Sequence, residues 1–215
     1  LTLPDAEIHG DADWTDALRL LQGDGSLVRF LLGVLLIGFT LGIVNNYLAV
    51  YLDDIAAAGW IIGAAFAIAA LLEVPLMAQV PAFLNRWGTR LVLVGGVAVL
   101  PFRWLLYAII DEPLLVLPTQ VLHSIAMMAL LVVGVLYMDR LLARQWRASA
   151  QALYTAALHG IGPSLGLFTA GLIYERAGIT PVWLASAVIA LVGTAILGVA
   201  VDPQPIHQPR QEVTR

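Results

Sequence analysis

Six long apolar stretches separated by short polar breaks account for most of the chain. Each is at least about 20 residues long, which suits a helix that crosses a hydrocarbon core about 30 Å thick. The breaks are rich in the Asp, Glu, Arg, Gly and Pro residues that are typical of turns. The pattern therefore predicts an all-α membrane protein, a six-transmembrane-helix bundle with spans near residues 29–52, 60–82, 91–110, 114–138, 150–173 and 181–201.

Polar ends flank this transmembrane domain, which we expect to cover residues 29–201. Residues 1–28 are acidic, whereas a signal peptide would begin basic and turn apolar at once. Because the chain opens on Leu1 and on this acidic stretch, we interpret residues 1–28 as the cytoplasmic end of a central loop in a longer protein. Residues 202–215 are expected to form a cytoplasmic tail.

Composition agrees with the membrane class and excludes several others. Apolar residues make up 60% and charged residues 12% of the chain, against roughly 45–50% and 25% in ordinary soluble domains. With no cysteine, the chain has no disulfide framework and no Cys-based metal site. It also lacks metal-ligand spacing, a phosphate-binding loop and a nucleic-acid-binding patch. We therefore expect no metal, no cofactor, no catalytic residues and no nucleic-acid partner.

The arginines indicate how the spans are oriented. All 11 basic residues are arginine, which favours a GC-rich prokaryote as the source. Only Arg176 falls on one side of the predicted bundle, and the excess on the other side marks it as cytoplasmic. We expect both termini in the cytoplasm and a multi-pass protein of the plasma (inner) membrane. The arginines on the cytoplasmic side are Arg19, Arg29, Arg86, Arg90, Arg140, Arg144, Arg147, Arg210 and Arg215.

Two charged residues lie inside apolar spans. Glu73 is in the run 71–76, and Arg103 is in the run 100–105. An ionised group at the centre of a bilayer costs roughly 2.5–3.5 kcal/mol even on the lenient insertion scale. Such residues persist where they face a protein interior, pair with a partner, or bind ions or solutes. The two charges therefore point to a solute pathway across the membrane.

Other polar residues lie at comparable depth. Helix rise places Glu73 and Arg103 about 18–20 Å along their spans, entered from opposite sides, and the two histidines about 14 Å along theirs. A polar belt near the midplane is where alternating-access carriers bind solute. The remaining candidates for this belt are Asn45, Asn46, Gln120, His123 and His159.

Each candidate also has a purely structural interpretation. Glu73 and Arg103 would lock two helices if they formed a fixed ion pair. In the functional interpretation, a carboxylate in a low-dielectric surrounding holds its proton tightly and a nearby arginine favours release, so moving the arginine loads and unloads a proton. His123 either lines the cavity or bonds a neighbouring helix, and His159 either lines it or satisfies backbone groups freed by a proline. Asn45 and Asn46 are adjacent, so at most one is expected to face the pathway.

Glycines recur at a spacing of four in three spans. This spacing lets helix backbones approach closely, so it predicts tight helix packing. The pairs are Gly38 with Gly42, Gly59 with Gly63, and Gly162 with Gly166.

Three segments resemble the major facilitator superfamily. Residues 83–90, with Asn85, Arg86, Gly88 and Arg90, are similar to its short cytoplasmic loop motif, with Asn85 where Asp is commoner. Residues 137–151, with Asp139 and Arg140, resemble the next cytoplasmic loop, and residues 160–178 resemble the eleventh helix and its exit.

The placement of Glu73, Arg103, Gln120 and His123 is similar to the lactose-permease-like, MFS_1-like branch. Lactose permease carries a coupling glutamate three residues after the corresponding histidine, where this chain has Ala126. The resemblance implies the C-terminal six-helix half of a twelve-helix transporter, whose partners are the N-terminal half, the lipid bilayer, a small solute and protons. It implies secondary active transport by alternating access, as a symport of a sugar, a nucleoside, or an aromatic or organic acid.

Because Ala126 stands where lactose permease has its coupling glutamate, neither lactose as solute nor the proton route of that permease can be carried over to this chain. The roles expected of the belt residues come instead from their depth and chemistry. Proton coupling is expected at Glu73, Arg103 and His123. Arg103 and His123 are also expected to bind solute. The full set of expected solute-binding residues is Asn45, Asn46, Arg103, Gln120, His123 and His159.

Two other function classes remain as alternatives. A six-helix scaffold or sensor would explain the spans but not the cost of two charges in the membrane. An intramembrane serine protease is suggested by the Gly-x-Ser-x-Gly pattern around Ser164. That pattern is weak here, because His207 in the tail is the only histidine after Ser164. We therefore expect a transporter and not an enzyme.

Overall fold

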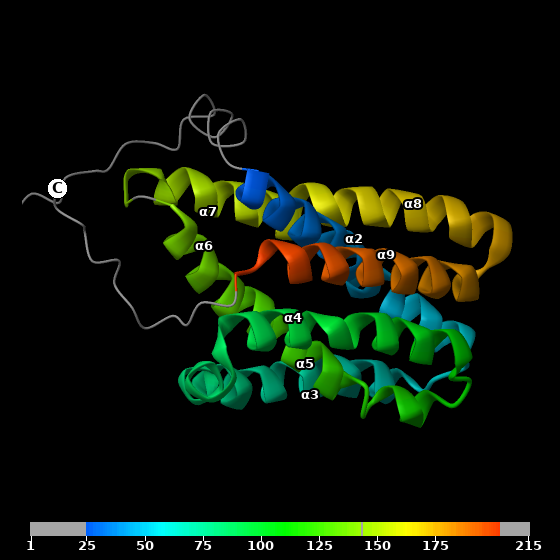
Figure 1. Ribbon diagram of the computed structural model, residues 1–215. Coiled ribbons are helices and arrows are strands. Elements are labelled where there is room, and N and C mark those ends of the chain that lie inside the picture. The colour runs from blue at the N-terminus through cyan, green and yellow to red at the C-terminus, as the bar shows by residue number, and fades with distance from the viewer. Residues whose placement is uncertain (1–24, 143, 203–215) are drawn as a thin grey trace, which may run out of the picture.

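Six apolar helical spans form one bundle in the computed structural model, which describes residues 25–142 and 144–202. Within these residues every regular element is helical, so the predicted all-α, six-span fold is confirmed. Figure 1 shows the helices running roughly side by side. The predictions for the acidic segment and the tail fall largely on residues 1–24 and 203–215, which lie outside the described residues. The spans are Gly25–Asp54, Gly59–Ala78, Val80–Ile109, Pro113–Leu141, Arg147–Ala177 and Ile179–Ala200.

Four spans each lie within one helical element, and the third of these elements is broken near its start. The first is α2 (Gly25–Asp54), the second α3 (Gly59–Ala78), the third α4 (Val80–Ile109) and the last α9 (Ile179–Ala200). The first helix begins four residues before the predicted boundary at residue 29, because the apolar pattern of α2 continues through Leu27 and Val28. Boundaries are the least certain part of a hydropathy-based prediction.

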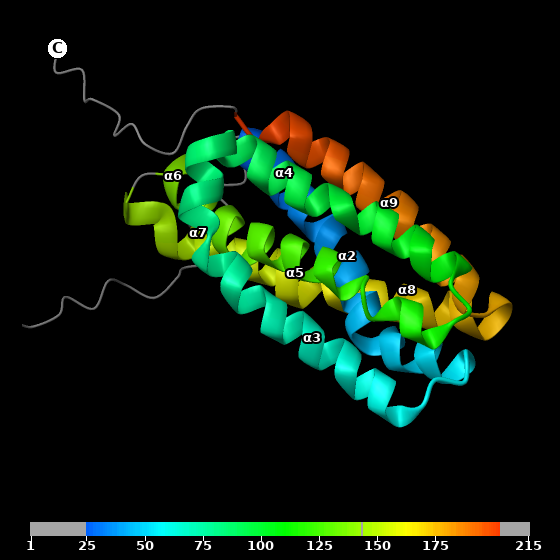
Figure 2. The same ribbon diagram turned by 90° about the horizontal axis from the view of Figure 1, so that it is seen from below.

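The predicted loop at residues 85–90 is largely helical, which corrects the sequence interpretation. Only Gln79 separates α3 from α4, and Pro81 stands in the first turn of α4, where a proline costs no hydrogen bond. Gly88, with φ of 75°, breaks the helix, and a residue with a side chain rarely adopts that conformation. Residues 80–87 therefore form a short helix that lies across the end of the bundle before α4 turns into the membrane (Figures 1 and 2).

The fourth and fifth spans are interrupted by wide π turns. The fourth contains η1 (Pro113–Val116), α5 (Gln120–Met128), the π turn η2 (Ala129–Gly134) and α6 (Val135–Leu141). The fifth follows η3 (Arg144–Trp146) and contains α7 (Arg147–Thr155), the π turn η4 (Ala156–Ile161) and α8 (Gly162–Ala177). π turns are rare and occur frequently at functional sites.

The helices differ in how much of their surface is buried inside the bundle. α9 packs along both α2 and α4, and α2 packs along α8. α3 packs mainly on α5 and is the least buried of the six spans. Figure 2 shows α3 at one edge of the bundle. Much of the surface of α3 and of α8 therefore remains free for lipid or for another protein.

Glycines bring the backbones of α2 and the fifth span together. A Cβ at Gly38 would lie 2.7 Å from the carbonyl oxygen of Ala157, and one at Gly166 would collide with the backbone of Phe39. Two of the three predicted glycine pairs thus lie at close helix contacts. The third pair does not, because a Cβ at Gly59 or Gly63 would meet nothing within 4 Å in the described structure.

Gly166→Ala should destabilise the bundle, because the new methyl group would press on the backbone of α2. Overpacking of this kind costs about 1–3 kcal/mol. The free energy of unfolding in detergent measures the loss, with Gly63→Ala on the open face of α3 as the matched control. Equal losses in the two variants would contradict the packing described here.

Candidate functional site

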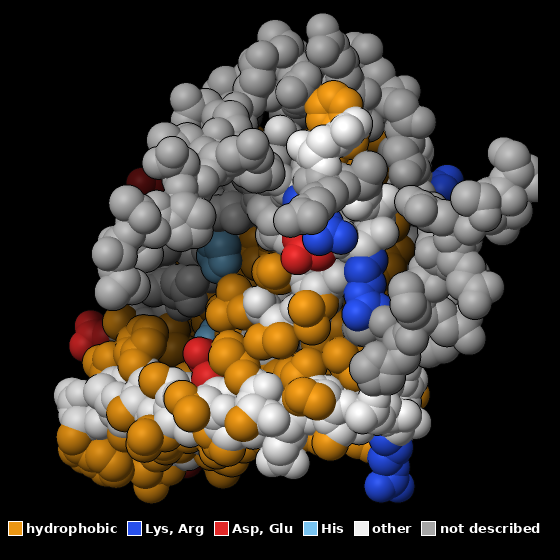
Figure 3. Space-filling view, turned by 90° about the vertical axis from the view of Figure 1, so that its left-hand side faces the viewer, with side chains coloured by type: hydrophobic (Ala, Val, Ile, Leu, Met, Phe, Trp, Pro, Cys, Tyr) orange, Lys and Arg blue, Asp and Glu red, His pale blue; other side chains and the backbone are white. Residues whose placement is uncertain are grey.

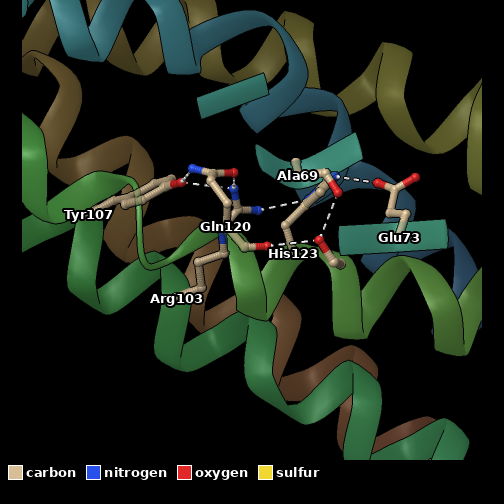
Figure 4. A network of polar contacts seen from close by, with 7 residues as sticks. Ala69, Glu73, Arg103, Tyr107, Gln120 and His123 are labelled. Carbon is tan, nitrogen blue, oxygen red and sulfur yellow. Dashed lines mark hydrogen bonds and ion pairs between the residues drawn. The ribbon is translucent and has the colours of Figure 1, made fainter. Parts of the chain in front are cut away.

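Arg103 on α4 is buried and is held by three polar side chains. Its side chain is 1% exposed. Nη2 donates to the hydroxyl of Tyr107 at 2.8 Å and to Oε1 of Gln120 at 3.0 Å. Nη1 lies 3.0 Å from Nδ1 of His123. The guanidinium therefore joins α4 to α5 at the level where the sequence predicted a polar belt (Figure 4).

The hydroxyl of Tyr107 is the hub of this contact network. It accepts from Arg103, it accepts from Nε2 of Gln120 at 3.1 Å, and it lies 3.3 Å from the hydroxyl of Thr119. The Thr119 hydroxyl also donates to the carbonyl oxygen of Val116 at 2.6 Å. A hydroxyl has only one proton to donate, and that of Thr119 goes to the nearer acceptor, the carbonyl oxygen of Val116. The hydroxyl of Tyr107 can therefore donate its own proton to the oxygen of Thr119.

Aromatic rings cover the guanidinium. Cζ of Arg103 lies 4.9 Å from the ring centre of Trp104 and 5.0 Å from that of Tyr107. The ring of Trp183, from α9, lies 5.2 Å from Tyr107 and 6.0 Å from Trp104. Ring faces attract a cation, and more strongly where water is absent. The charge of Arg103 is thus stabilised by ring faces and neutral acceptors.

His123 lies between the two charged residues. A guanidinium has only donors, so Nδ1 of His123 must accept the hydrogen bond from Arg103. An imidazole that accepts at Nδ1 is neutral and carries its proton on Nε2. That nitrogen lies 3.6 Å from Oε1 of Glu73, just beyond hydrogen-bonding distance. The contacts therefore order the three groups as Glu73, His123, Arg103.

Glu73 does not contact Arg103, which corrects the hypothesis of a direct ion pair between them. Among the described residues, the ion-pair contact of Glu73 is with His123. The Glu73 side chain is 24% exposed, whereas Arg103 is buried on the other side of His123. α3 is tied to α5 next to this site, since the hydroxyl of Ser124 donates to the carbonyl oxygen of Ala69 at 2.9 Å.

Of the remaining belt candidates, all except Gln120 lie apart from this network. Asn45 and Asn46 on α2 are both exposed, and Nδ2 of Asn46 donates to the carbonyl oxygen of Gly42 at 2.8 Å. His159 lies in η4 and is also exposed. Gln120 is buried and bonds Arg103. The structure therefore brings together Glu73, Arg103, Gln120 and His123, and leaves the two asparagines and the second histidine on open surface.

The loop-motif residues lie at one end of the bundle, away from the network around Arg103. Cζ of Arg86 stands 5.6 Å from the ring centre of Trp87, and Nη2 of Arg90 donates to the carbonyl oxygen of Gly198 at 2.6 Å. Asp139 accepts from Nε2 of Gln151 at 2.9 Å. Figure 3 looks at this end, where arginine and acidic side chains stand close together. Other residues of the motif that are exposed here are Asn85 and Arg140.

Tyr107, Thr119 and Ser124 are site residues that the sequence reasoning did not single out. Tyr107 follows Arg103 by four residues, and side chains at that spacing lie on one helix face. That spacing was a usable signal for Tyr107. The bonds of Thr119 and Ser124 depend on how the fourth span is rotated against its neighbours, which the hydropathy pattern does not specify.

Comparison with known proteins identifies the family. The sequence model of the MFS_1 like family matches residues 6–185. The chain belongs to this family. Its members are membrane transporters and not enzymes, as predicted. The hydroxyl of Ser164 donates to the carbonyl oxygen of Gly160 in its own span, and the protease alternative has no further support.

Three curated relatives are longer than this chain, and two of them are named as a transporter or permease. An uncharacterized transporter, YwbF, of Bacillus subtilis is 26% identical over 77% of this chain and 42% of its own length. A maltose permease of Geobacillus stearothermophilus is 29% identical over 71% of this chain and 39% of its own length. A major facilitator superfamily domain-containing protein 6-like of Mus musculus is 29% identical over 90% of this chain and 33% of its own length. The chain thus spans less than half the length of these relatives.

A solved structure supports the fold. The crystal structure of the nucleoside transporter NupG superposes with a TM-score of 0.75 over 94% of this chain and 56% of that chain, at 21% identity. The fold is therefore a six-helix half of the major facilitator fold, and the protein is a multi-pass integral membrane protein.

The contacts of Arg103 predict which residues are energetically coupled. Arg103→Gln and Tyr107→Phe should be non-additive in the free energy of unfolding by about 0.5–3 kcal/mol, because the two side chains touch. Arg103→Gln and Glu73→Gln should add to within about 0.5 kcal/mol once His123→Ala has removed the residue between them. Coupling of Glu73 to Arg103 that survives His123→Ala would contradict the order of contacts.

Proposed function

We propose that the chain is the C-terminal half of a proton-coupled secondary transporter of small neutral polar solutes. The observation that supports this most directly is the row Glu73, His123, Arg103. It places a partly exposed carboxylate next to a neutral imidazole whose far nitrogen faces a buried cation.

Proton coupling rests on what Arg103 does to His123. While Nη1 of Arg103 donates to Nδ1, that nitrogen cannot take a proton, so a proton that enters the site stays on Glu73. When Arg103 moves away, Nδ1 becomes free and the imidazole can be protonated beside the Glu73 carboxylate. Proton loading thus depends on the distance between α4 and α5, which alternating access would change.

The exposed groups favour a neutral solute. Arg103, the cation among the expected solute-binding residues, is 1% exposed and surrounded by protein, whereas the accessible charged group of the site is the carboxylate of Glu73. A carboxylate repels organic acids and accepts hydrogen bonds from hydroxyl groups. The sugar or nucleoside class therefore fits better than the acid class. A maltose permease and a nucleoside transporter are among the similar proteins, which supports this choice.

Solute contacts are assigned to exposed polar side chains. Asn45, Asn46 and His159 offer donors and acceptors on open surface. Gln120 and Arg103 are buried and bond each other, so they hold His123 in place and do not contact the solute. His123, with its side chain 15% exposed, is a proton-coupling residue that can also meet the solute.

An N-terminal half is the proposed partner of this chain. α3 and α8 present little-buried surfaces, and the chain covers 56% of a whole transporter of the same fold. The excess of arginine at one end of the bundle supports cytoplasmic termini in the inner membrane of a prokaryote. A scaffold or sensor role would keep the same fold but would not require the charge of Glu73.

Glu73→Gln in the full-length protein should abolish accumulation of a neutral sugar or nucleoside against its gradient while solute exchange continues. The amide can still accept hydrogen bonds from solute hydroxyl groups but cannot carry the coupling proton. Uptake and counterflow in vesicles with an imposed pH gradient measure the two activities. Glu175→Gln, at an exposed carboxylate at the far end of α8, is the control and should accumulate solute normally. Wild-type accumulation in the Glu73→Gln variant would contradict proton coupling at this residue.

A further inference from the structure

The π turn in the fourth span has a bond from a neighbouring helix. The hydroxyl of Tyr154, at the end of α7, donates to the carbonyl oxygen of Leu130 at 2.7 Å. Leu130 lies in η2, where the wide turn replaces the regular α-helical bonds. Buried backbone carbonyls need a donor. The tyrosine supplies that donor from outside the helix, across the join between two spans.

A glycine makes room for this hydroxyl. A Cβ at Gly134, the last residue of η2, would collide with the hydroxyl oxygen of Tyr154. Tyr154 is 2% exposed, and its ring stacks on Phe30 of α2 with centres 6.0 Å apart and planes at 14°. The ring is thus fixed by the densely packed part of the bundle, and its hydroxyl reaches into the π turn.

The same turn adjoins the proton site. Gln120, His123 and Ser124 all lie on α5, which leads directly into η2. At the junction, a Cβ at Gly96 of α4 would lie 2.5 Å from Cβ of Ala129, so α4 and the start of η2 are in close contact there. A change of bend at η2 would move α5 about this contact. It would alter the distance between His123 and Arg103.

We propose that Tyr154 is a positioning residue for the proton site, although it touches none of its members. Its hydroxyl holds η2 in the bend that keeps Nδ1 of His123 against Arg103. This inference rests on the proposed function, since it concerns control of the same site. α3 moves with α5 through the bond from Ser124 to Ala69, so Glu73 stays beside His123 when the bend relaxes.

The expected effect of losing the hydroxyl has a definite sign. The charged or titratable groups that face His123 are Glu73 from α3 and, from α4, Arg103 with the adjoining Tyr107. If the bend relaxes, the arginine withdraws from Nδ1 and the carboxylate remains. Protonation of the imidazole then becomes easier, and the pH profile of uptake moves to higher pH.

Tyr154→Phe in the full-length transporter tests the proposal, with Tyr137→Phe as the matched control. Both rings are buried against Phe30, but the Tyr137 hydroxyl donates to the carbonyl oxygen of Ala200 at the end of α9, at 3.0 Å. One hydrogen bond is worth about a fivefold change in equilibrium. In Tyr154→Phe the proton concentration at half-maximal uptake should fall about fivefold. Tyr137→Phe should leave the midpoint unchanged.

A second measurement does not depend on protons. This chain has no cysteine, so once any reactive cysteine in the rest of the full-length protein is replaced, spin labels can be placed at Val121 on α5 and Leu191 on α9, both exposed. The distance distribution between the labels should shift in Tyr154→Phe and stay as in the parent protein in Tyr137→Phe. An unchanged distribution in Tyr154→Phe, or an equal midpoint shift in both variants, would overturn the positioning role. If Glu73→Gln shows that uptake is not proton-coupled, the label distances still decide whether Tyr154 positions α5.

Discussion

A buried guanidinium can be stable in a membrane only where acceptors surround it, and this requirement organises the site. Arg103 has donors only and is 1% exposed. Its partners are all neutral, namely the Tyr107 hydroxyl, the Gln120 amide oxygen and the His123 imidazole. Each partner is thereby fixed in orientation, and α4 and α5 are held at one relative position. A carboxylate in direct contact would have neutralised the charge of Arg103, and His123 would then not have been needed as an acceptor.

The consequence for function lies in the protonation of His123. As long as Arg103 donates to Nδ1, the imidazole is neutral and presents its remaining proton towards Glu73. The positive charge is thus kept away from the open surface, and the negative one faces it. Movement of α5 away from α4 would reverse the restriction, and the π turn η2, adjacent to α5 and bonded by Tyr154, is placed to govern that movement.

Much of this was predictable from the sequence, and the rest was not for physical reasons. Apolar length alone gave six spans, and the cost of charge in lipid singled out Glu73 and Arg103. Hydropathy does not fix the rotation of one helix against another. A direct pair of Glu73 and Arg103 was therefore a reasonable hypothesis, and the sequence could not show that His123 lies between them. A π turn differs from an α-helix by one extra residue and has no compositional signal. The sequence therefore did not predict η2 or its hydrogen bond from Tyr154.

The protonation state of His123 tests the central claim most directly. Nitrogen-15 labelling of histidine, followed by solid-state NMR of the full-length protein in bilayers at neutral pH, distinguishes the two neutral tautomers from the imidazolium. His123→Gln identifies the signal by its loss. The account predicts a neutral ring protonated on Nε2 with a hydrogen-bonded Nδ1. An imidazolium, or a ring protonated on Nδ1, would show that Arg103 does not donate to His123 and would contradict the account.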